Sequence, residues 1–307
     1  MSDLYFLTVN YYSTSLIDRL LDSLATNTVI DYQFIIVNNS PDDHQLHKIK
    51  RNSVVIIESS KNLGFGAACN LGLDFIAREN SQAIVWLINP DTYFVAENSE
   101  PAIALRRGQS PIAFFNKHSH ISILGTTVYK SSGEVDFAGG TFVPEKGTIS
   151  TINLLPTDLK TDYVKSDWIS GCSLLINLRN FKQCPQFDNR YFLYYEDFDF
   201  CRRYAEQGHQ IAVTQRLSII HETSSITNRN MFKKFKHITY SYLLSMERYS
   251  NPNIFVLTLC RISLNTLLLL PIKPHQALGK LVGLYNYLQS KLTLKINKYK
   301  LKYLNLY

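Results

Sequence analysis

Short apolar runs alternate with amphipathic stretches over roughly the first third of the chain. Runs such as Phe34–Val37 are apolar at every position, which is typical of strands buried on both faces of a sheet. Strands are predicted over residues 3–12, 34–37, 54–57 and 83–88, and helices over residues 16–25 and from the turn at 62–66 to about residue 78. Strands that alternate with helices across short turns indicate a mostly parallel sheet with helices on both faces.

The pattern changes after Asp91. Strand-like pieces at 121–129, 142–152 and 173–176 stand among glycines and indicate a more antiparallel part. A helix is predicted over residues 196–207, and another strand over residues 210–213. The predicted fold class is therefore α/β, with a mostly parallel central sheet flanked by helices, a smaller antiparallel part and a C-terminal helical extension.

From about residue 228 the pattern is helical, with breaks at Pro252, Pro271 and Pro274. The most apolar stretch, residues 254–270, is interrupted by Arg261 and Asn265 and falls short of the ~20 residues that a membrane span requires. This favours a core helix or a membrane-surface helix. Two domains are predicted, residues 1–226 and residues 227–307.

The formal net charge of +7 is distributed unevenly along the chain. Residues 227–307 hold 13 Lys and Arg and a single acid, Glu247, so their charge is about +12, whereas the preceding residues sum to about −5. The basic tail is expected to meet something anionic, either nucleic acid or a membrane surface. An acidic body without a nucleic-acid-binding motif argues against nucleic acid.

Two basic clusters stand out in this tail. The first interleaves basic residues with phenylalanines, and the second repeats lysines along one helical face. Their basic residues are Arg229, Lys233, Lys234 and Lys236 in the first and Lys291, Lys295, Lys298 and Lys302 in the second. Basic amphipathic helices bind anionic bilayers. The alternative is a solvated face that packs on the body or on another subunit of a homo-oligomer.

The cysteines bear on the compartment. Five cysteines are scattered without a CxxC pair, which indicates free thiols in a reducing compartment. The first residues, Met1-Ser2-Asp3, lack a basic region and lead at once into a strand, so no signal peptide is expected. These features predict a cytoplasmic location.

Candidate chemistry begins at Asp91, which follows a buried strand and Asn89-Pro90. An acid at the carboxyl end of such a strand lies where α/β sheets present their ligand crevice. His221 follows another apolar stretch, and an oxygen ligand with an imidazole would suit Mn²⁺ or Mg²⁺, with phosphate completing the shell. A structural role for His221 is the alternative.

Three carboxylates, Glu196, Asp197 and Asp199, fall within one predicted helical turn. One of them can serve as a general base, or all can complement the helix dipole while Asp199 pairs with Arg202 or Arg203. The glycine-bearing turn at 62–66 either contacts phosphate or only begins a helix.

Several motifs, taken in order over residues 3–226, resemble the inverting, nucleotide-sugar-dependent glycosyltransferases of family 2, with the GT-A fold, and among them the rhamnosyltransferase-like branch. The motifs are Thr8-Val9-Asn10-Tyr11, Val37-Asn38-Asn39-Ser40, Asn62-x-Gly64-Phe65-Gly66 with Asn70, Asn89-Pro90-Asp91, Trp168-x-Ser170-Gly171, Phe192-x-Tyr194-Tyr195-Glu196-Asp197-x-Asp199, and His221 with Ser225.

The resemblance implies a role for each matching residue. The nucleotide sugar would be bound by Asn10, Asn38, Asn39, Ser40, Asn62, Gly64, Asn70 and Asn89. Asp91 matches the last acid of the family's metal-binding element and His221 its second protein ligand, for Mn²⁺ or Mg²⁺. In the Glu196-Asp197 pair, Asp197 matches the catalytic base. Trp168, Gly171 and Tyr195 would line the acceptor subsite. The turn Val37-Asn38-Asn39 lacks the acid that family members use to contact the base.

The implied function is transfer of a sugar from a nucleotide-diphosphate donor, dTDP-rhamnose or a UDP-hexose, to a hydroxyl of a growing, lipid-linked bacterial surface glycan at the inner face of the cell membrane. A sugar-nucleotide nucleotidyltransferase is one alternative, but its glycine-rich signature is missing near Asn10. A catalytically dead nucleotide-sugar-binding protein is the other alternative. The retention of Asp91, Glu196, Asp197 and His221 argues against it.

Overall fold

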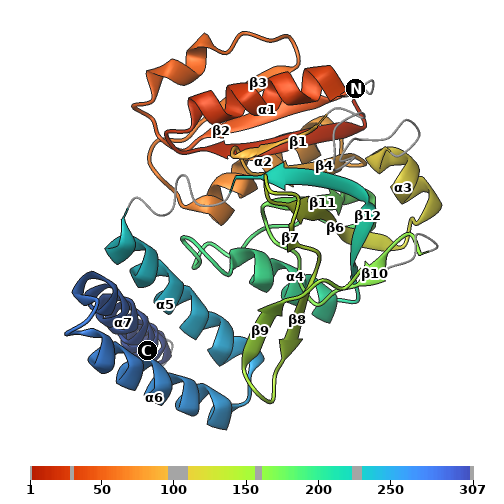
Figure 1. Cartoon of the computed structure of the whole chain (residues 1–307). Coiled ribbons are helices and arrows are strands. Elements are labelled where there is room, and N and C mark those ends of the chain that lie inside the picture. Colours follow the sequence, from red (N-terminus) through yellow and green to blue (C-terminus); the bar gives the residue numbers. More distant parts are fainter. Residues whose placement is uncertain (1, 28–30, 96–109, 156–160, 223–229, 305–307) are drawn as a thin grey trace. The chain divides into compact units, whose positions relative to one another are not determined.

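The computed structural model describes residues 2–27, 31–95, 110–155, 161–222 and 230–304, and the side chains of these up to residue 293 (Figure 1). Two compact units are present. The first comprises Met1–Phe142, Ile149–Phe192 and Glu196–Ser225, and the second Val143–Thr148, Leu193–Tyr195 and Ile226–Tyr307. The predicted domain boundary at 226/227 and Ser225 lie outside the described residues.

The first unit is built on a mixed sheet. In spatial order its main strands are β10 (Val164–Lys165), β12 (Gln210–His221), β6 (Ile121–Tyr129), β11 (Ser173–Asn177), β4 (Ile84–Ile88), β1 (Leu4–Asn10), β2 (Gln33–Asn38) and β3 (Val54–Glu58). The pairs β4–β1, β1–β2, β2–β3 and β12–β6 are parallel, whereas β11 runs antiparallel between β6 and β4. The short β5 (Thr92–Tyr93) and β7 (Val135–Phe137) pair with β12 and β6, and β8 (Gly140–Val143) pairs with β9 (Thr148–Thr151).

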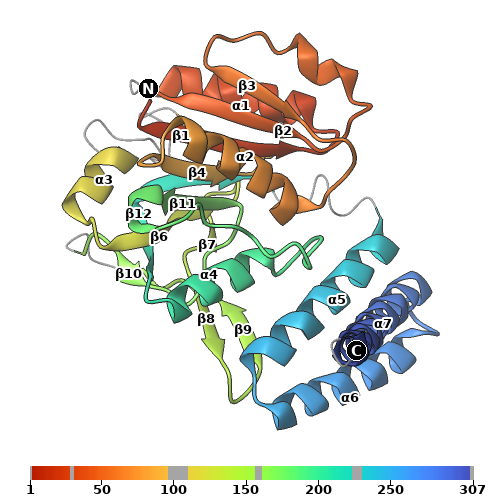
Figure 2. The same ribbon diagram turned by 180° about the vertical axis from the view of Figure 1, so that it is seen from behind.

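Helices cover both faces of this sheet. In Figures 1 and 2, α1 (Thr14–Asn27) lies on one face, and α2 (Phe65–Glu79) and α4 (Glu196–Glu206) lie on the other. A further short helix, α3 (Pro111–Lys117), and two 3₁₀ turns, His44–Lys48 and Leu178–Asn180, complete the described helical parts of this unit. The predicted α/β class, with its mostly parallel sheet, smaller antiparallel part and C-terminal helices, is confirmed.

The core explains why β4 is central. All five of its side chains are buried, as predicted for a strand covered on both faces. The Trp86 ring stacks on Phe6 at 5.2 Å between centroids, and its indole N–H donates to Ser173 Oγ at 2.8 Å. A buried indole with a satisfied N–H contributes large apolar area without an unpaired donor. The strand end that carries Asp91 is therefore held rigidly.

Two predicted strands differ from the structure. The strand expected to end at residue 213 continues to His221, because a register shift between Thr214 and Ser218 carries the polar Gln215-Arg216 across the pairing with β6. The strand expected over 142–152 is split into β8 and β9 by a turn in which Gly147 adopts φ +58. Glycine adopts this left-handed conformation without steric cost.

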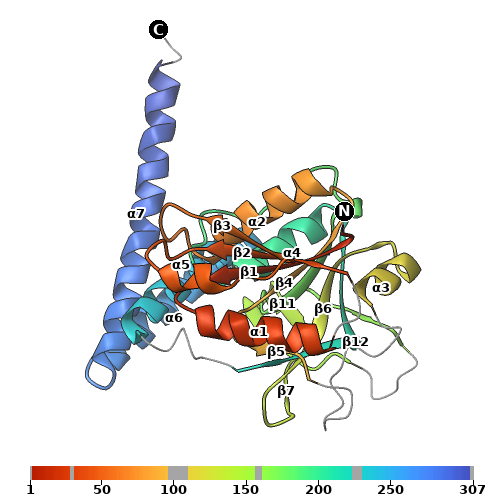
Figure 3. The same cartoon turned by 90° about the horizontal axis from the view of Figure 1, so that it is seen from above.

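The second unit contains three helices, α5 (Met231–Tyr249), α6 (Pro252–Leu269) and α7 (Pro274–Leu304), which are separated at the predicted prolines. Asn230 and Asn251 cap α5 and α6, since their side chains accept from backbone N–H groups three residues on. Figure 3 shows α7 as one long helix whose C-terminal part extends beyond α5 and α6. Among the described residues, α6 is the one helix long and apolar enough to cross a membrane, with a mean hydropathy of 1.4.

Candidate active site

Asp91 and His221 meet because β5 pairs with the end of β12. Thr92 lies opposite His221, and the Glu222 N–H donates to the Asp91 carbonyl at 2.9 Å. The Asp91 carboxylate then lies 3.3 Å from His221 Nε2. The structure thus brings together the two residues predicted to share a metal, although 129 positions separate them in the sequence.

Sequence reasoning missed two further groups around this histidine. Asp136, on β7, lies 3.4 Å from His221 Nδ1, so the imidazole stands between two carboxylates. The buried Cys172 also hydrogen-bonds His221. Burial alone would lower the pKa of His221, but its hydrogen bonds to Asp91 and Cys172 raise that pKa well above its ordinary value. Nothing in the sequence around Asp136 indicated this contact.

The residues present fit a divalent cation in part. Asp91 offers a carboxylate and His221 an imidazole, and both side chains are largely buried. Among the described residues, no group of three or more His, Cys, Asp and Glu side chains is arranged to hold a metal ion by itself. Asp91 and His221 could therefore hold Mn²⁺ or Mg²⁺ only with ligands from a substrate or water.

Asp197 and Glu196 begin α4, where the backbone N–H groups are free to bind an acid. Asp197 accepts from the Gly171 N–H at 2.9 Å and from the Phe198 N–H at 2.8 Å. Burial raises the pKa of Asp197, and these two hydrogen bonds to the carboxylate offset part of that rise. The side chain is therefore oriented, and its pKa lies above that of an exposed aspartate.

Glu196 has different surroundings. It is 5% exposed, and its Oε2 has no hydrogen-bond partner among the described residues. Burial and the neighbouring charge of Asp197 raise the pKa of Glu196 well above its ordinary value. A protonated Glu196 beside an ionisable Asp197 is the arrangement that these surroundings favour.

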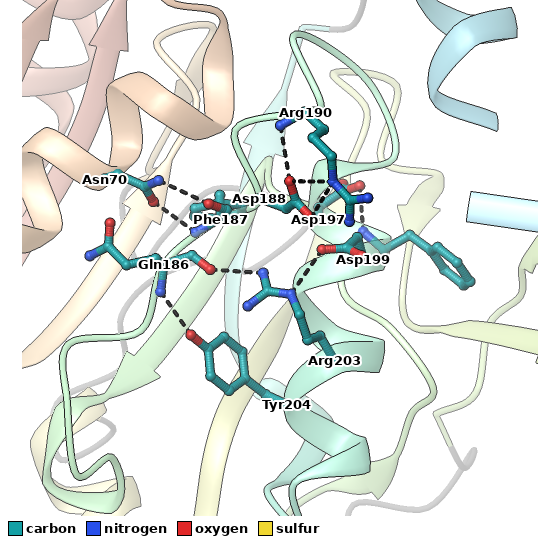
Figure 4. A network of polar contacts seen from close by, with 10 residues as sticks. Asn70, Gln186, Phe187, Asp188, Arg190, Asp197, Asp199, Arg203 and Tyr204 are labelled. Carbon is teal, nitrogen blue, oxygen red and sulfur yellow. Dashed lines mark hydrogen bonds and ion pairs between the residues drawn. The ribbon is translucent and has the colours of Figure 1, made fainter. Parts of the chain in front are cut away.

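For Asp199 the structure shows the alternative role, pairing with an arginine of the same helix. It is fully buried and pairs with Arg203 at 3.1 Å, one helical turn away. Arg203 also donates to the Gln186 carbonyl, which ties α4 to the segment before it (Figure 4). Asp199 therefore holds the helix in place.

Residues 171 and 172 connect the two groups of acids. The Gly171 N–H donates to Asp197, while the Cys172 carbonyl accepts from Asn89 N–H at 2.9 Å and the Cys172 side chain contacts His221. One short segment thus links the predicted base to the predicted metal ligands. All of these residues belong to the first unit.

The asparagines at the ends of β1 and β2 contact each other. Asn10 donates to Asn38 at 3.1 Å and to Asp43 at 3.0 Å, and Asn38 donates to Glu58 at 2.9 Å. Ser40 Oγ completes this buried network. These amides hold the strand ends in register, and their predicted contact with a nucleoside stays a prediction.

The carboxylates of Asp43 and Glu58 place acids at this edge, although the turn Val37-Asn38-Asn39 has none. Next to them, Tyr12 adopts φ 50 and its hydroxyl donates to the exposed Asp42 at 2.6 Å, a bond that raises the pKa of Tyr12 to about 12. The Tyr11 and Tyr12 rings, about two-fifths exposed, lie 5.1 Å apart at the carboxyl end of β1. Sequence reasoning missed this aromatic and acidic group.

The turn before α2 depends on Asn39, Asn62 and Gly64. Asn39 donates to Asn62 Oδ1 and accepts from the Leu63 N–H, and Asn62 in turn accepts from the Gly64 N–H. Gly64 has φ +86, and a Cβ there would lie 2.2 Å from the Phe192 carbonyl oxygen. The glycine is thus required by the chain itself. Nucleotide contact at this turn stays a prediction.

Asn70, on α2, holds the segment that precedes α4. It donates to the Phe187 carbonyl at 2.9 Å and accepts from the Phe187 N–H at 2.7 Å (Figure 4). A side-chain amide paired with both backbone groups of one residue fixes that loop. A contact of Asn70 with the donor stays a prediction.

The three residues predicted to line the acceptor subsite have separate surroundings. Trp168 packs over Gly140 and beside Phe137, and its indole N–H has no partner among the described residues. Gly171 lies against Asp197. Tyr195 belongs to the second unit, where its ring lies 5.4 Å from that of Tyr242, and its φ of 63 is strained for a tyrosine.

This fold is the GT-A fold of glycosyltransferases. GalNAc-T7, solved with UDP, GalNAc and Mn²⁺, aligns over 79% of this chain and 50% of its own, with a TM-score of 0.52 and 13% identity. The mannosyltransferase PcManGT of Pyrobaculum calidifontis, solved with GDP-Man and Mn²⁺, aligns over 94% of this chain and 88% of its own, with a TM-score of 0.50 and 10% identity. The chain spans only about half the length of the GalNAc-T7 chain that it matches.

Residues 6–152 match the family model described as Glycosyl transferase family 2. Two relatives extend the similarity. The low-salt glycan biosynthesis hexosyltransferase Agl10 of Haloferax volcanii is 23% identical over 72% of this chain and 67% of its own length. The rhamnosyltransferase WbbL of Escherichia coli K12 is 25% identical over 81% of this chain and 96% of its own. The predicted family is confirmed.

Proposed function

We propose that the protein is an inverting hexosyltransferase that moves a sugar from a nucleoside-diphosphate donor to an acceptor hydroxyl. The observation that carries this proposal is the Asp197 carboxylate, which two backbone N–H groups orient beside the segment that contacts Asn89 and His221. A base held at one side of a diphosphate site is what a single displacement requires.

In this reaction Asp197 takes the proton of the acceptor hydroxyl as its oxygen attacks the anomeric carbon and the bond to the diphosphate breaks. Gly171 and Phe198 keep the carboxylate oxygens aimed, since each donates to a different oxygen. Asp91 and His221 would hold a divalent cation, which as a Lewis acid stabilises the negative charge of the leaving diphosphate.

The donor is a dTDP- or UDP-activated sugar, rhamnose or another hexose, in keeping with the hexosyl- and rhamnosyltransferase relatives. The acceptor is a growing surface glycan on a lipid carrier, and the enzyme acts in the cytoplasm at the inner face of the membrane. The basic tail supports this placement, since an anionic membrane attracts it.

A thermal-shift screen with dTDP-, UDP- and GDP-sugars, each with and without Mn²⁺, tests the donor. We expect one class of nucleotide sugar to stabilise the protein, and only when Mn²⁺ is present. Slow hydrolysis of that donor, which releases the free sugar, should follow. Asp91→Ala should abolish the metal-dependent stabilisation. Absence of any metal-dependent shift in the native protein would refute the proposed donor site.

Asp197→Asn separates catalysis from binding. The variant should lose sugar transfer by about 10³-fold or more while its affinity for the nucleotide stays within about twofold, because the side chain acts only on the acceptor proton. Equal loss of nucleotide affinity and of transfer would show that Asp197 belongs to the donor site.

A further inference from the structure

α6 differs from an ordinary surface helix because its exposed side is mostly apolar. Its two buried side chains are threonines, Thr258 and Thr266, whereas leucines and a valine face outward. Leu264 is 60% exposed and Leu268 62%, and Ile272 just after the helix is 71% exposed. In an ordinary surface helix the apolar stripe faces the core. The outward leucines and valine of α6 therefore form a surface that water disfavours.

The exposed residues of α6 share one face. They recur at helical spacing, and apart from one arginine, two asparagines and a proline they are apolar or cysteine. They are Pro252, Asn253, Val256, Leu257, Cys260, Arg261, Leu264, Asn265, Leu267 and Leu268. The opposite side packs inside the unit, where Phe255 lies 6.0 Å from the ring of Tyr287 on α7. Apolar patches of this kind mark sites of protein or membrane contact.

We infer that this outward face of α6 inserts into the outer apolar layer of a lipid bilayer with an anionic surface. The inference rests on the proposed function in one respect, since that function places the enzyme at a membrane. It names α6 as the contact, whereas the sequence pointed to the lysine clusters. Of those clusters, Arg229 and the side chains of Lys295, Lys298 and Lys302 lie outside the described residues.

Charge selects a bilayer over a second copy of the chain. Residues 227–307 carry 13 Lys and Arg against one acid, so two such surfaces brought together would repel each other. An anionic surface attracts the same charges. Arg261 lies within the apolar face, and its long side chain can reach headgroup phosphates while its methylene groups stay among lipid tails.

The neighbours of α6 favour a helix that lies in the membrane plane over a span. Glu247 on α5 pairs with Lys291 on α7. A spanning α6 would draw these charged helices into hydrocarbon, where charged side chains are costly. If only one face of α6 inserts, the charged helices α5 and α7 stay on the water side of the membrane surface.

A fluorophore on Cys260 tests the contact in the full-length protein. Cys260 is the exposed cysteine, since Cys69, Cys172 and Cys201 are buried and Cys184 is partly buried. An environment-sensitive maleimide dye on Cys260 should shift to the blue and brighten when vesicles of phosphatidylcholine with phosphatidylglycerol are added. The same dye on the variant Cys260→Ser with Ser132→Cys, an exposed site in the first unit, should not respond.

Flotation with the same vesicles supplies the second measurement. Leu264→Ser with Leu268→Ser should weaken binding at least about tenfold, because two leucines lose their apolar contact. Val135→Ser with Ile152→Ser, which changes exposed apolar residues elsewhere, should bind as the native protein does.

Either of two results would overturn the inference. One is an unchanged affinity of the α6 variant for vesicles, and the other is a dye response on Cys260 that depends on protein concentration without lipid, which indicates a second copy. Soluble donor hydrolysis should be equal in the α6 variant and the native protein. Failure of membrane binding is thereby separated from failure of the proposed activity.

Discussion

Glu196 and Asp197 are adjacent carboxyl groups whose surroundings divide their roles. Asp197 accepts two backbone hydrogen bonds, whereas the Oε2 of Glu196 is buried without a partner among the described residues. Hydrogen bonds to the charged form favour ionisation, and burial without them disfavours it. Pairs of carboxyl groups whose surroundings push their pKa values apart are typical of acid–base catalysis.

The pair predicts a pH profile. Asp197 must be ionised to accept a proton, and burial raises its pKa, so kcat/KM should fall as the pH drops through a value above the ordinary ~3.9 of an aspartate. Glu196→Gln should keep this acid limb and most of the activity, since glutamine replaces a group that is already neutral. An acid limb that disappears in Glu196→Gln would instead make Glu196 the base.

Asp136 provides a second prediction at this scale. A carboxylate that accepts from the far nitrogen of a metal-binding histidine orients the ring, and its loss typically costs 10–100-fold in metal affinity. Asp136→Asn should therefore weaken Mn²⁺ binding by about tenfold in the presence of the nucleotide, as titrated by electron paramagnetic resonance. Glu134→Gln, an exposed change two residues away, is the control. Equal Mn²⁺ affinities in both variants would remove Asp136 from the site.

Among the elements, the turn that begins α2 is tied to the segment before α4. The Phe65 N–H donates to the Phe192 carbonyl at 2.9 Å, and Gly64 lies against the same carbonyl. The two segments that carry predicted donor and catalytic residues are therefore joined by backbone contacts. This geometry requires glycine whether or not a ligand is bound.

Substitution of two glycines separates conformational strain from steric overlap. Gly64→Ala should destabilise the protein by about 3 kcal/mol or more, because the new Cβ meets a carbonyl in addition to the strain of positive φ. Gly208→Ala also has positive φ but meets nothing within 4 Å, so its cost should be about 1 kcal/mol. Urea unfolding measures both, and equal costs would mean that the Phe192 contact relaxes freely.

For the whole molecule, the reactivity of the thiols tests the packing of the first unit. All five cysteines are free thiols, and burial raises the pKa of Cys69, Cys172 and Cys201. In native protein we expect Cys260 to react quickly with a disulfide reagent such as DTNB, Cys184 slowly, and the buried three only on unfolding. A rapid reaction of all five in the native state would contradict the packing of the first unit.

Features that depend on neighbouring residues could be predicted from the chain's residue pattern. The apolar run of β4 and the turn Asn89-Pro90-Asp91 predicted a buried strand with an acid at its end, and both are present. The motifs predicted the family, and the prolines predicted the breaks between α5, α6 and α7. Burial on both faces, turn chemistry and helix termination are local properties, so periodicity and residue type express them.

Contacts between groups far apart in the chain became known from the folded structure. It placed Asp136 on His221, joined Asp197 to the segment at Gly171, and turned the amides of Asn10, Asn38 and Asn70 toward other parts of the chain. It also turned the threonines of α6 inward and four of its six leucines outward. A nearly uniform apolar helix carries no periodic signal, and contacts across a hundred residues depend on how strands pair, which no local pattern records.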